Sequence, residues 1–290
     1  MFIALDMDGT LLHSEGYISP RNKDAIKKAQ DAGHIVAIAT GRAYKDAYLP
    51  LERAGLHCPI IGLNGAMITL ESGAVMSEVP LHRHAFIPTL EWVRTQPDLY
   101  CELYTNTAVY VGLHNREHLE ALAYKVREEH PDLQRIVQKQ FQQARVTYVE
   151  DISQVWHDDS LIVYKILIFS LNIHLLKEAS FQFAKLPNVA VTSSHPNNIE
   201  INHQQATKGE AIKKLASYYG MELSDTVVVG DSLNDLPMFA VAGYRVAMGN
   251  AAEAVKQQSD SITATNDEDG VALILEELVQ KGNVPRQRLV

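Results

Sequence analysis

Two short segments carry acidic residues at close spacing. Asp6 and Asp8 lie within the sequence DMDGT, and Asp231 and Asp235 lie within GDSLND. Each segment follows an apolar run typical of a strand buried on both faces, and open α/β sheets bind ligands at the carboxyl ends of such strands. Because Asp6 and Asp8 are two residues apart, we expect them to project from the same side of an extended segment.

Four carboxylates at one sheet edge repel each other strongly unless a cation lies among them. Oxygen ligands with few carboxylates favour Mg²⁺, completed by waters, over a caged Ca²⁺. Asp8-Gly9 taken alone is ordinary turn chemistry, but the complete DMDGT segment after a buried strand favours a catalytic role. For Asn234 and Asp235, simple capping of the following helix stays open as an alternative.

One further segment offers groups suited to a phosphate oxygen, and another carries a lysine at an unusual position. Thr40-Gly41-Arg42 follows the apolar run IVAIA and places a hydroxyl and backbone N–H groups at a strand-to-helix junction. Lys208 stands near the start of a predicted helix, where the helix dipole disfavours a cation. Taken alone, Thr40 is a typical helix-capping residue and Lys208 a typical solvent-exposed lysine.

The elements that position these groups alternate regularly at the start of the chain. Ser19-Pro20 predicts the beginning of a helix that ends at Gly33. The order strand–helix–strand–helix–strand predicts right-handed parallel crossovers in a doubly wound sheet. The apolar runs predict strands at Phe2–Leu5, Ile35–Ala39 and Pro59–Leu63, and a second helix at Tyr44–Ala54.

From about His82 to Val191 this alternation is lost, which indicates an inserted α+β domain. Its predicted elements are strand-like Tyr100–Val111, a helix at Arg116–Glu129, a strand at Leu161–Phe169, a helix at Asn172–Ala184 and a short strand around Val189. The alternation then returns, and the polar tail from Lys281 is expected to fray. The later predicted elements are helices at Lys208–Tyr219, Asn234–Ala242 and Asp269–Leu278, and strands at Thr226–Val229, Arg245–Met248 and Asp260–Thr263.

The composition is that of an ordinary globular protein. The 290 residues include 35 acidic and 26 basic side chains, giving a formal net charge of −9, which disfavours nucleic acid or an anionic membrane as a partner. Two cysteines, Cys58 and Cys101, make no disulfide scaffold, so we expect a reducing, cytoplasmic setting. The longest apolar run, Leu161–Leu171, is too short to span a membrane, and the first residues do not match a signal peptide.

The segments DMDGT, ATGR, TKGEA and GDSLND, in this order, resemble the four motifs of the haloacid dehalogenase (HAD) phosphatase superfamily. The finer resemblance is to its Cof-type (IIB) sugar-phosphatase-like subfamily, whose cap domain lies between the second and third motifs. Asn64-Gly65, SSHPNNIEI, AMGNA and TNDEDGVA also resemble this subfamily. The resemblance implies a Rossmann-like HAD core of residues 1–81 and 193–290 with an inserted α+β cap of residues 82–192.

The resemblance also implies a role for each motif residue. Asp6 is expected to be the nucleophile that forms an aspartyl-phosphate, and Asp8, partly buried beside a carboxylate, the general acid and then base. Mg²⁺ is expected on the Asp6 carboxylate, the Asp8 backbone carbonyl and Asp231, with Asp235 orienting its waters. The phosphoryl oxygens are expected to be held by Thr40, the Gly41 amide, Lys208 and Asn234, while Arg42 either contacts the phosphate or braces the cap.

The implied reaction is Mg²⁺-dependent hydrolysis of phosphomonoesters of small metabolites, such as sugar phosphates or phosphorylated cofactors and their precursors. One alternative is a phosphotransferase or phosphomutase that passes the phosphoryl group to a sugar. Another is a non-catalytic sensor of a phosphorylated metabolite. We expect a small phosphorylated partner and a monomer by default, and the sequence does not name the substrate.

The cap is expected to choose the substrate and to exclude water when closed. Glu102, Tyr104 and Tyr148 are candidates for a leaving-group pocket, although an exposed sheet face or a half-buried tyrosine is the commoner role. Cys101 is predicted to lie in the core. The histidine pairs lack a convincing metal-ligand set and are predicted at the surface; they are His82/His84, His114/His118 and His195/His203.

Overall fold

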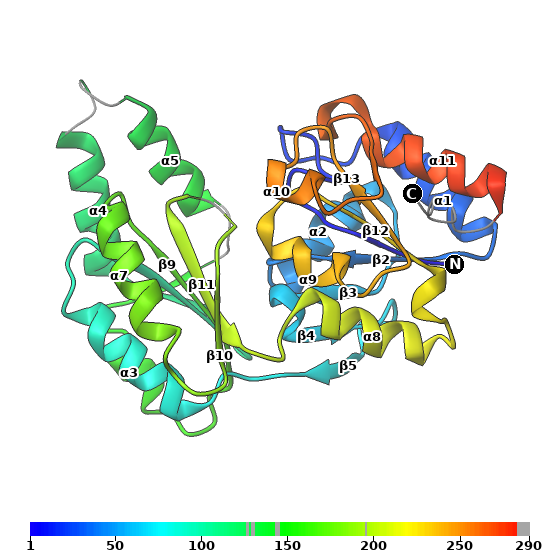
Figure 1. Cartoon of the computed structure of the whole chain (residues 1–290). Helices are drawn as coiled ribbons and strands as arrows, with labels where there is room; N and C mark the ends of the chain where they lie inside the picture. The colour runs from blue at the N-terminus through cyan, green and yellow to red at the C-terminus, as the bar shows by residue number, and fades with distance from the viewer. Residues whose placement is uncertain (126–127, 129–130, 143–145, 195, 283–290) are drawn as a thin grey trace. The chain divides into compact units, whose positions relative to one another are not determined.

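Figure 1 shows a computed structural model of the chain, which describes residues 1–125, 128, 131–142, 146–194 and 196–282. The chain forms two compact units. The core unit contains residues 1–78 and the residues from 205 onward, and the cap unit contains residues 79–204. The cap unit is therefore an insertion within the chain of the core unit.

The core sheet has the strand order β14-β13-β12-β1-β2-β3-β4-β5. The pairs from β14 to β3 are parallel, and the pairs β3–β4 and β4–β5 are antiparallel. The doubly wound parallel sheet expected from the strand–helix order is confirmed, with a short antiparallel hairpin added at one edge. The strands are β1 (Phe2–Leu5), β2 (Ile35–Ala39), β3 (Ile60–Gly62), β4 (Met67–Thr69), β5 (Val75–Glu78), β12 (Thr226–Gly230), β13 (Tyr244–Ala247) and β14 (Ser261–Ile262).

The core helices begin and end where local sequence chemistry predicts. α1 (Pro20–Asp31) starts after Ser19, whose hydroxyl accepts a backbone N–H of the first turn, and α2 (Tyr44–Ala54) ends at Gly55 in the left-handed conformation. Helices α1 and α11 pack side by side (Figure 1). The other core helices are α8 (Lys208–Tyr218), α9 (Leu236–Phe239), α10 (Glu253–Lys256) and α11 (Gly270–Lys281), with 3₁₀ turns η1 (Leu63–Gly65), η2 (Leu223–Asp225), η3 (Leu233–Asp235) and η4 (Asn266–Glu268).

The cap unit contains a second sheet in the order β10-β11-β9-β6-β7-β8, antiparallel except for the β7–β8 pair. Helices α3 and α7 lie on one side of this sheet (Figure 1), and their apolar side chains belong to the buried core of the cap unit. The strands are β6 (Tyr100–Thr105), β7 (Val109–Gly112), β8 (Val146–Val149), β9 (Val163–Phe169), β10 (Val189–Thr192) and β11 (Asn198–His203). The helices are α3 (Arg83–Arg94), α4 (Leu113–Lys125), α5 (Pro131–Gln142), α6 (Ser153–Trp156) and α7 (Ile173–Phe183).

The segment after residue 192 lies in a different unit from the one predicted. Strand β11 pairs with β9 from Asn198 to Asn202, so it completes the cap sheet rather than joining the core. The chain passes from the core unit into the cap unit between Glu78 and Val79. It returns to the core unit between Gln204 and Gln205. The similarity of this segment to a known subfamily did not reveal which sheet its strand extends.

Other elements are shorter than predicted. The strand expected over Tyr100–Val111 is a hairpin of β6 and β7, and the helix expected over Asn234–Ala242 is a 3₁₀ turn followed by the single turn of α9. The end of the helix predicted to reach Glu129, and the tail predicted to fray, fall largely outside the described residues. Boundaries of this kind depend on tertiary contacts that the local pattern does not contain.

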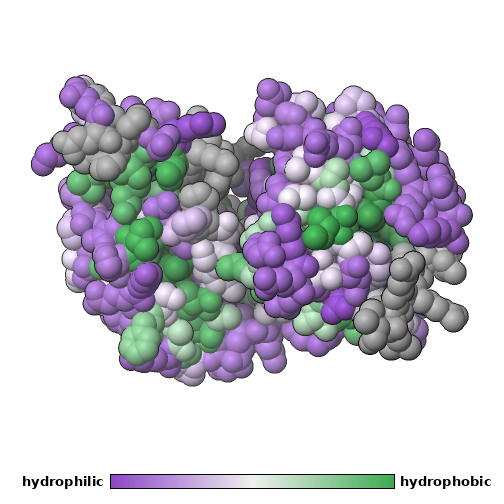
Figure 2. Space-filling model, turned by 45° about the horizontal axis from the view of Figure 1, so that its top comes forward, coloured by the Kyte–Doolittle hydropathy of each residue, from purple (hydrophilic) through white to green (hydrophobic). Residues whose placement is uncertain are grey.

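Apolar side chains fill the interior of each unit. Strands β1, β2 and β12 are almost completely buried, which explains their unbroken apolar runs. Cys58 and Cys101 are both buried, which confirms the core position predicted for Cys101. On the face drawn in Figure 2, hydrophilic side chains predominate, and apolar ones form smaller separate patches. Within the described part of the chain, every helix is too short or too polar to cross a membrane.

Candidate active site

The predicted site residues of the core gather where neighbouring parallel strands end. Strands β12, β1 and β2 lie next to one another in the sheet. Asp231, Asp6 and Thr40 are the residues that directly follow these strands. Since the carboxyl ends of parallel strands share one edge of the sheet, these polar groups lie at the usual ligand-binding edge of an open α/β fold.

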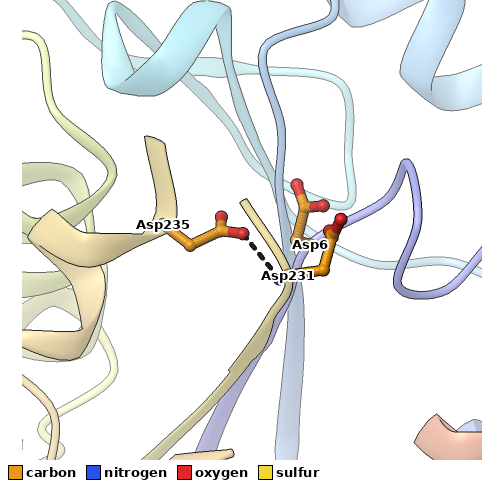
Figure 3. Close-up of side chains that lie close together, drawn as sticks. All are labelled: Asp6, Asp231 and Asp235. Atoms are coloured by element: carbon orange, nitrogen blue, oxygen red, sulfur yellow. Dashed lines mark hydrogen bonds between the residues drawn. The ribbon is translucent and has the colours of Figure 1, made fainter. Parts of the chain in front are cut away.

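Three carboxylates point toward one another at this edge (Figure 3). Asp6, Asp231 and Asp235 each offer one oxygen, and these three oxygens lie within 4.8 Å of one another. Asp6 and Asp235 are buried, and Asp231 is half-buried. Asp235, which was expected to act on metal-bound waters, thus belongs to the same cluster of oxygens as the two predicted side-chain ligands.

Lys208 neutralises part of this negative charge. Its Nζ lies 2.6 Å from Asp6 Oδ1 and 2.6 Å from Asp235 Oδ1, and its side chain is completely buried. The alternative that Lys208 is an ordinary surface lysine is therefore wrong. Thr207 caps α8 by accepting the Glu210 N–H, so the first residue of the helix carries its cation into the site.

The Asp235 side chain also accepts hydrogen bonds from the backbone. Its Oδ2 accepts the N–H of Asp231 at 2.9 Å and the N–H of Ser232 at 3.0 Å, which forms a capping box for the turn η3. The alternative that Asp235 caps the helix that follows is wrong, because its side chain makes no cap hydrogen bond to α9 and instead bonds the start of η3. The same carboxylate bonds Lys208 through its other oxygen, so it joins the turn after β12 to helix α8.

The charge balance of the cluster raises the pKa of its acids. Burial raises the pKa of Asp6 well above its usual range, the nearby Asp235 raises it further, and Lys208 acts in the opposite direction. Burial and Asp235 also raise the pKa of Asp231, against hydrogen bonds from Thr10 and Ser232. Burial is thus the main cause of both raised pKa values, and repulsion by Asp235 is the second.

Asp8 is arranged differently from the prediction. Its side chain is 60% exposed, and Arg42 binds both of its oxygens, with Nε at 2.7 Å and a terminal nitrogen at 2.6 Å. The expected partial burial is therefore wrong. The expected extended segment is also wrong, because the N–H groups of Leu11 and Leu12 bond back to the carbonyls of Asp6 and Met7 and close a turn.

The predicted phosphate-binding residues lie around the same edge. Thr40 is buried, and its hydroxyl accepts the Arg42 N–H at 3.2 Å. It does not cap α2, whose N-cap is Ala43, so that alternative is wrong. Gly41 lies between Thr40 and Arg42 at the end of β2. Asn234 lies in η3 and donates its side-chain amide to Asn64 Oδ1 at 3.3 Å.

Residues 3–275 match the sequence model of a protein family, the haloacid dehalogenase-like hydrolases. The chain belongs to this family. It is 36% identical over 282 residues to 5-amino-6-(5-phospho-D-ribitylamino)uracil phosphatase YwtE of Bacillus subtilis, covering 96% of this chain and 97% of that protein. It is 33% identical over 283 residues to phosphatase YwpJ of the same organism, covering 96% and 99%. A solved haloacid dehalogenase-like hydrolase from B. subtilis has a TM-score of 0.85 at 33% identity, covering 96% and 99% of the two chains.

Three residues of this HAD-like hydrolase support Asp231 without having been predicted to do so. The Thr10 hydroxyl donates to Asp231 Oδ1, and the Ser232 hydroxyl donates to its Oδ2, each at 3.0 Å. Gly9 has a φ of 77°, and a Cβ there would lie 2.5 Å from Asp231 Oδ2, so only glycine fits. Thr10 and Gly9 belong to DMDGT, and their position in that segment was the available signal.

The cap residues considered for a leaving-group pocket have partners within the cap. Glu102 is completely buried and accepts hydrogen bonds from Tyr100 at 3.0 Å and Tyr104 at 2.6 Å. Tyr104 is also buried, so the alternative that Glu102 and Tyr104 lie on an exposed sheet face is wrong. Lys165 lies over the Tyr104 ring at 4.3 Å. Tyr148 is exposed and binds Arg116. The cap sheet of this hydrolase therefore contains a buried polar cluster that the sequence reasoning found only in part.

The histidines of the HAD-like hydrolase follow the surface prediction only partly. His203 is buried at the end of β11, and its ring packs edge-on against His82 at 5.3 Å, so its predicted exposure is wrong. His82 in turn stacks on His84. His195 lies outside the described residues. Among the described residues, the Asp6, Asp231 and Asp235 cluster is the potential metal site that geometry identifies.

Proposed function

We propose that this HAD-like hydrolase is a Mg²⁺-dependent phosphatase that hydrolyses phosphomonoesters of small metabolites through an aspartyl-phosphate on Asp6. The observation that carries the proposal is the position of Asp6. Its carboxylate is paired with the Lys208 ammonium and has an oxygen within 4.8 Å of oxygens of Asp231 and Asp235, at the carboxyl edge of a parallel sheet. A nucleophile there has the Lys208 ammonium beside it, and the neighbouring carboxylates could hold a metal cation, so positive charge would be available to stabilise a phosphoryl group.

The carboxylate cluster fits a hard divalent cation. Its donors are oxygens only, and three carboxylates share one buried cation, Lys208. Asp6 and Asp231 would hold Mg²⁺, with the Asp8 backbone carbonyl as a third protein ligand and Asp235 beside them. When bound, the ion would supply positive charge to the phosphoryl oxygens and to the Asp6 carboxylate.

In the first half-reaction, an Asp6 oxygen attacks the phosphorus atom and the bond from phosphorus to the leaving oxygen breaks. Asp8 gives its proton to that oxygen, so an alcohol departs and Asp8 becomes a carboxylate. Lys208, Thr40, the Gly41 amide and Asn234 stabilise the charge on the phosphoryl oxygens during the transfer. The aspartyl-phosphate on Asp6 is the product of this step.

In the second half-reaction, the Asp8 carboxylate accepts a proton from water as the water oxygen attacks phosphorus. The bond between phosphorus and the Asp6 oxygen breaks, which releases inorganic phosphate and restores the Asp6 carboxylate. Asp8 is again protonated, so the catalytic groups return to their starting states. Arg42 binds both oxygens of Asp8, which orients the carboxylate as the base of this step. In the first half-reaction one of these two bonds gives way to the proton that Asp8 donates.

The names of the relatives guide the choice of substrates. YwtE is named for the phosphatase reaction on 5-amino-6-(5-phospho-D-ribitylamino)uracil. We therefore place this compound beside the sugar phosphates as the first substrates to test, both being small phosphorylated polyol or sugar derivatives. The net acidic chain with its two buried cysteines suits a reducing, cytoplasmic setting.

The test is phosphate release from these compounds with and without Mg²⁺, with Asp6→Asn as the inactive control. We expect release that needs both Mg²⁺ and Asp6. Release that occurs only when a sugar acceptor is added would favour the phosphotransferase or phosphomutase alternative. Binding of the compounds without any turnover would favour the sensor and contradict the proposal.

A further inference from the structure

The turn that follows β3 has an unusual backbone. Leu63 and Asn64 are consecutive residues with φ values of 53° and 60°, in the left-handed region that residues other than glycine seldom adopt. Both side chains are buried. Asparagine tolerates this conformation better than most residues, whereas leucine does not. Such outliers gather at functional sites, where the surrounding structure holds them in place.

Contacts on both sides fix this turn. The Leu63 N–H donates to the Arg42 carbonyl at 2.9 Å, and the Asn64 N–H donates to the Thr40 carbonyl at 3.0 Å. On the other side, a Cβ on Gly65 would lie 2.2 Å from the Thr207 carbonyl oxygen, so the turn packs directly against the start of α8. The turn therefore touches the segment of Thr40 and the helix that carries Lys208.

The Asn64 side chain reaches a third element of the site. Its Oδ1 accepts the side-chain amide of Asn234 at 3.3 Å. Rotation of the Asn234 amide by half a turn would place its oxygen against Asn64 Oδ1, and two acceptors repel each other. Asn64 thus selects the orientation in which the NH₂ group of Asn234 faces it, which leaves the second N–H of that group for another acceptor.

We infer that Asn64 is a positioning residue for phosphoryl transfer, which orients the Asn234 amide so that an N–H is presented to a phosphoryl oxygen. The inference rests on the proposed function, in which Asn234 holds the phosphoryl group. The strained turn explains why the position suits asparagine: the residue must adopt the left-handed conformation and also supply a side-chain acceptor. A buried apolar residue cannot supply the acceptor, and it adopts the left-handed conformation only at an energetic cost, as the neighbouring Leu63 does.

The test is Asn64→Gly, which removes the side chain and keeps a residue that adopts the left-handed conformation readily. We expect kcat to fall about tenfold, with a weaker inhibition by inorganic phosphate, because a misdirected donor no longer stabilises the phosphoryl oxygens. Circular dichroism and thermal unfolding establish that each variant is folded.

Asn188→Gly is a matched control. Asn188 also has a φ of 60°, and its Oδ1 accepts the side-chain amide of Gln204 at 3.1 Å, but it lies in the cap unit between α7 and β10. Its replacement removes the same kind of bond from the same kind of backbone. We expect the kcat and the phosphate inhibition constant of this variant to remain those of the wild type.

A double-mutant cycle separates the inference from the proposed function. If Asn64 acts through Asn234, then Asn64→Gly causes no further loss of kcat in an Asn234→Ala background. A loss that multiplies that of Asn234→Ala overturns the inference, as does wild-type kcat in Asn64→Gly when Asn234→Ala is impaired. If Asn234→Ala itself has wild-type kcat and phosphate inhibition, the phosphate-binding role of Asn234 fails and the inference fails with it.

Discussion

Arg42 binds both carboxylate oxygens of Asp8, through Nε at 2.7 Å and a terminal nitrogen at 2.6 Å. This geometry is the parallel, two-bond pairing that a guanidinium forms with a carboxylate. The Asp8 side chain is more than half exposed, so packing alone does not fix its orientation. The guanidinium instead fixes the direction of the Asp8 carboxylate, which we propose as the general acid, and it also donates to the Asp46 carbonyl of α2.

Arg42→Lys should therefore impair proton transfer more than substrate binding, since an ammonium cannot reproduce the two-bond geometry. We expect kcat to fall about tenfold or more for substrates with alcohol leaving groups. This loss is part of the roughly 10²–10⁴-fold rate increase that general acid–base catalysis contributes. The loss should be much smaller for p-nitrophenyl phosphate, whose leaving group needs little protonation. Steady-state kinetics with both substrate types measures this difference.

Arg245→Lys is the control for this comparison. Arg245 binds Asp260 with the same two-bond geometry, at 2.8 and 2.6 Å, at another place in the core unit. Its replacement should leave the ratio of the two substrate rates unchanged. Equal losses with both substrates in Arg42→Lys would contradict the positioning of Asp8 by Arg42.

Lys208→Met should reduce both activity and stability. The change leaves Asp6 and Asp235 buried without their shared cation, and removal of one partner from a buried pair costs about 3–5 kcal/mol. We expect kcat to fall by about 10²-fold or more, because a donor to the transition state is lost. Added Mg²⁺ should raise the melting temperature of this variant more than that of the wild type. Thermal unfolding with and without Mg²⁺ checks the prediction.

Lys213→Met gives the matched comparison, since Lys213 also lies in α8 and pairs with Glu210 at the surface. Exposed pairs contribute little to stability, so this variant should melt close to the wild type. A Lys208→Met variant that behaved like Lys213→Met would show that the buried pairs of Lys208 do not support the site.

The sequence allowed the edge of the core sheet to be predicted, because each site residue follows its own strand directly. Asp6, Thr40 and Asp231 could be placed in this way from local patterns alone. Lys208 could not, since its ion pair with Asp6 joins residues separated by 202 positions and no periodicity reveals its burial. The resemblance to a family supplied its role, and the structure supplied the environment.

Other features depend on tertiary contacts that local sequence does not encode. The turn at Asp8 is closed by backbone hydrogen bonds, and its side chain is directed by Arg42 from a different strand end. Strand β11 has an ordinary alternating pattern, and its pairing with β9 is what assigns it to the cap. Asn64 gave a weak signal, as one half of an Asn-Gly pair, and its contact with Asn234 spans 170 positions.

Removal of the metal should abolish turnover and lower stability. We expect EDTA to stop phosphate release and excess Mg²⁺ to restore it. Because a ligand that binds the folded state stabilises it, Mg²⁺ should raise the melting temperature of the metal-free protein, and Asp231→Asn should reduce this shift. Asp267→Asn, an exposed acid of η4, should keep the full shift. An equal Mg²⁺ effect in both variants would place the bound ion away from the carboxylate cluster.

Because His203 is buried, we expect it to affect how the stability of the fold depends on pH. Burial lowers the pKa of His203 below its usual value, and the neighbouring His82 lowers it further. At a pH between the folded and the unfolded pKa of this histidine, the unfolded chain binds more protons than the folded one. The stabilisation of the fold by neutral His203 is therefore fully present above a pH of about 6.5 and is lost as the pH falls toward the lowered pKa. We expect His203→Gln to show a smaller drop in melting temperature between pH 7 and pH 5 than the wild type. His174→Gln, an exposed position in α7, serves as the control and should follow the wild-type curve. The same drop in all three proteins would mean that His203 carries no part of the acid sensitivity.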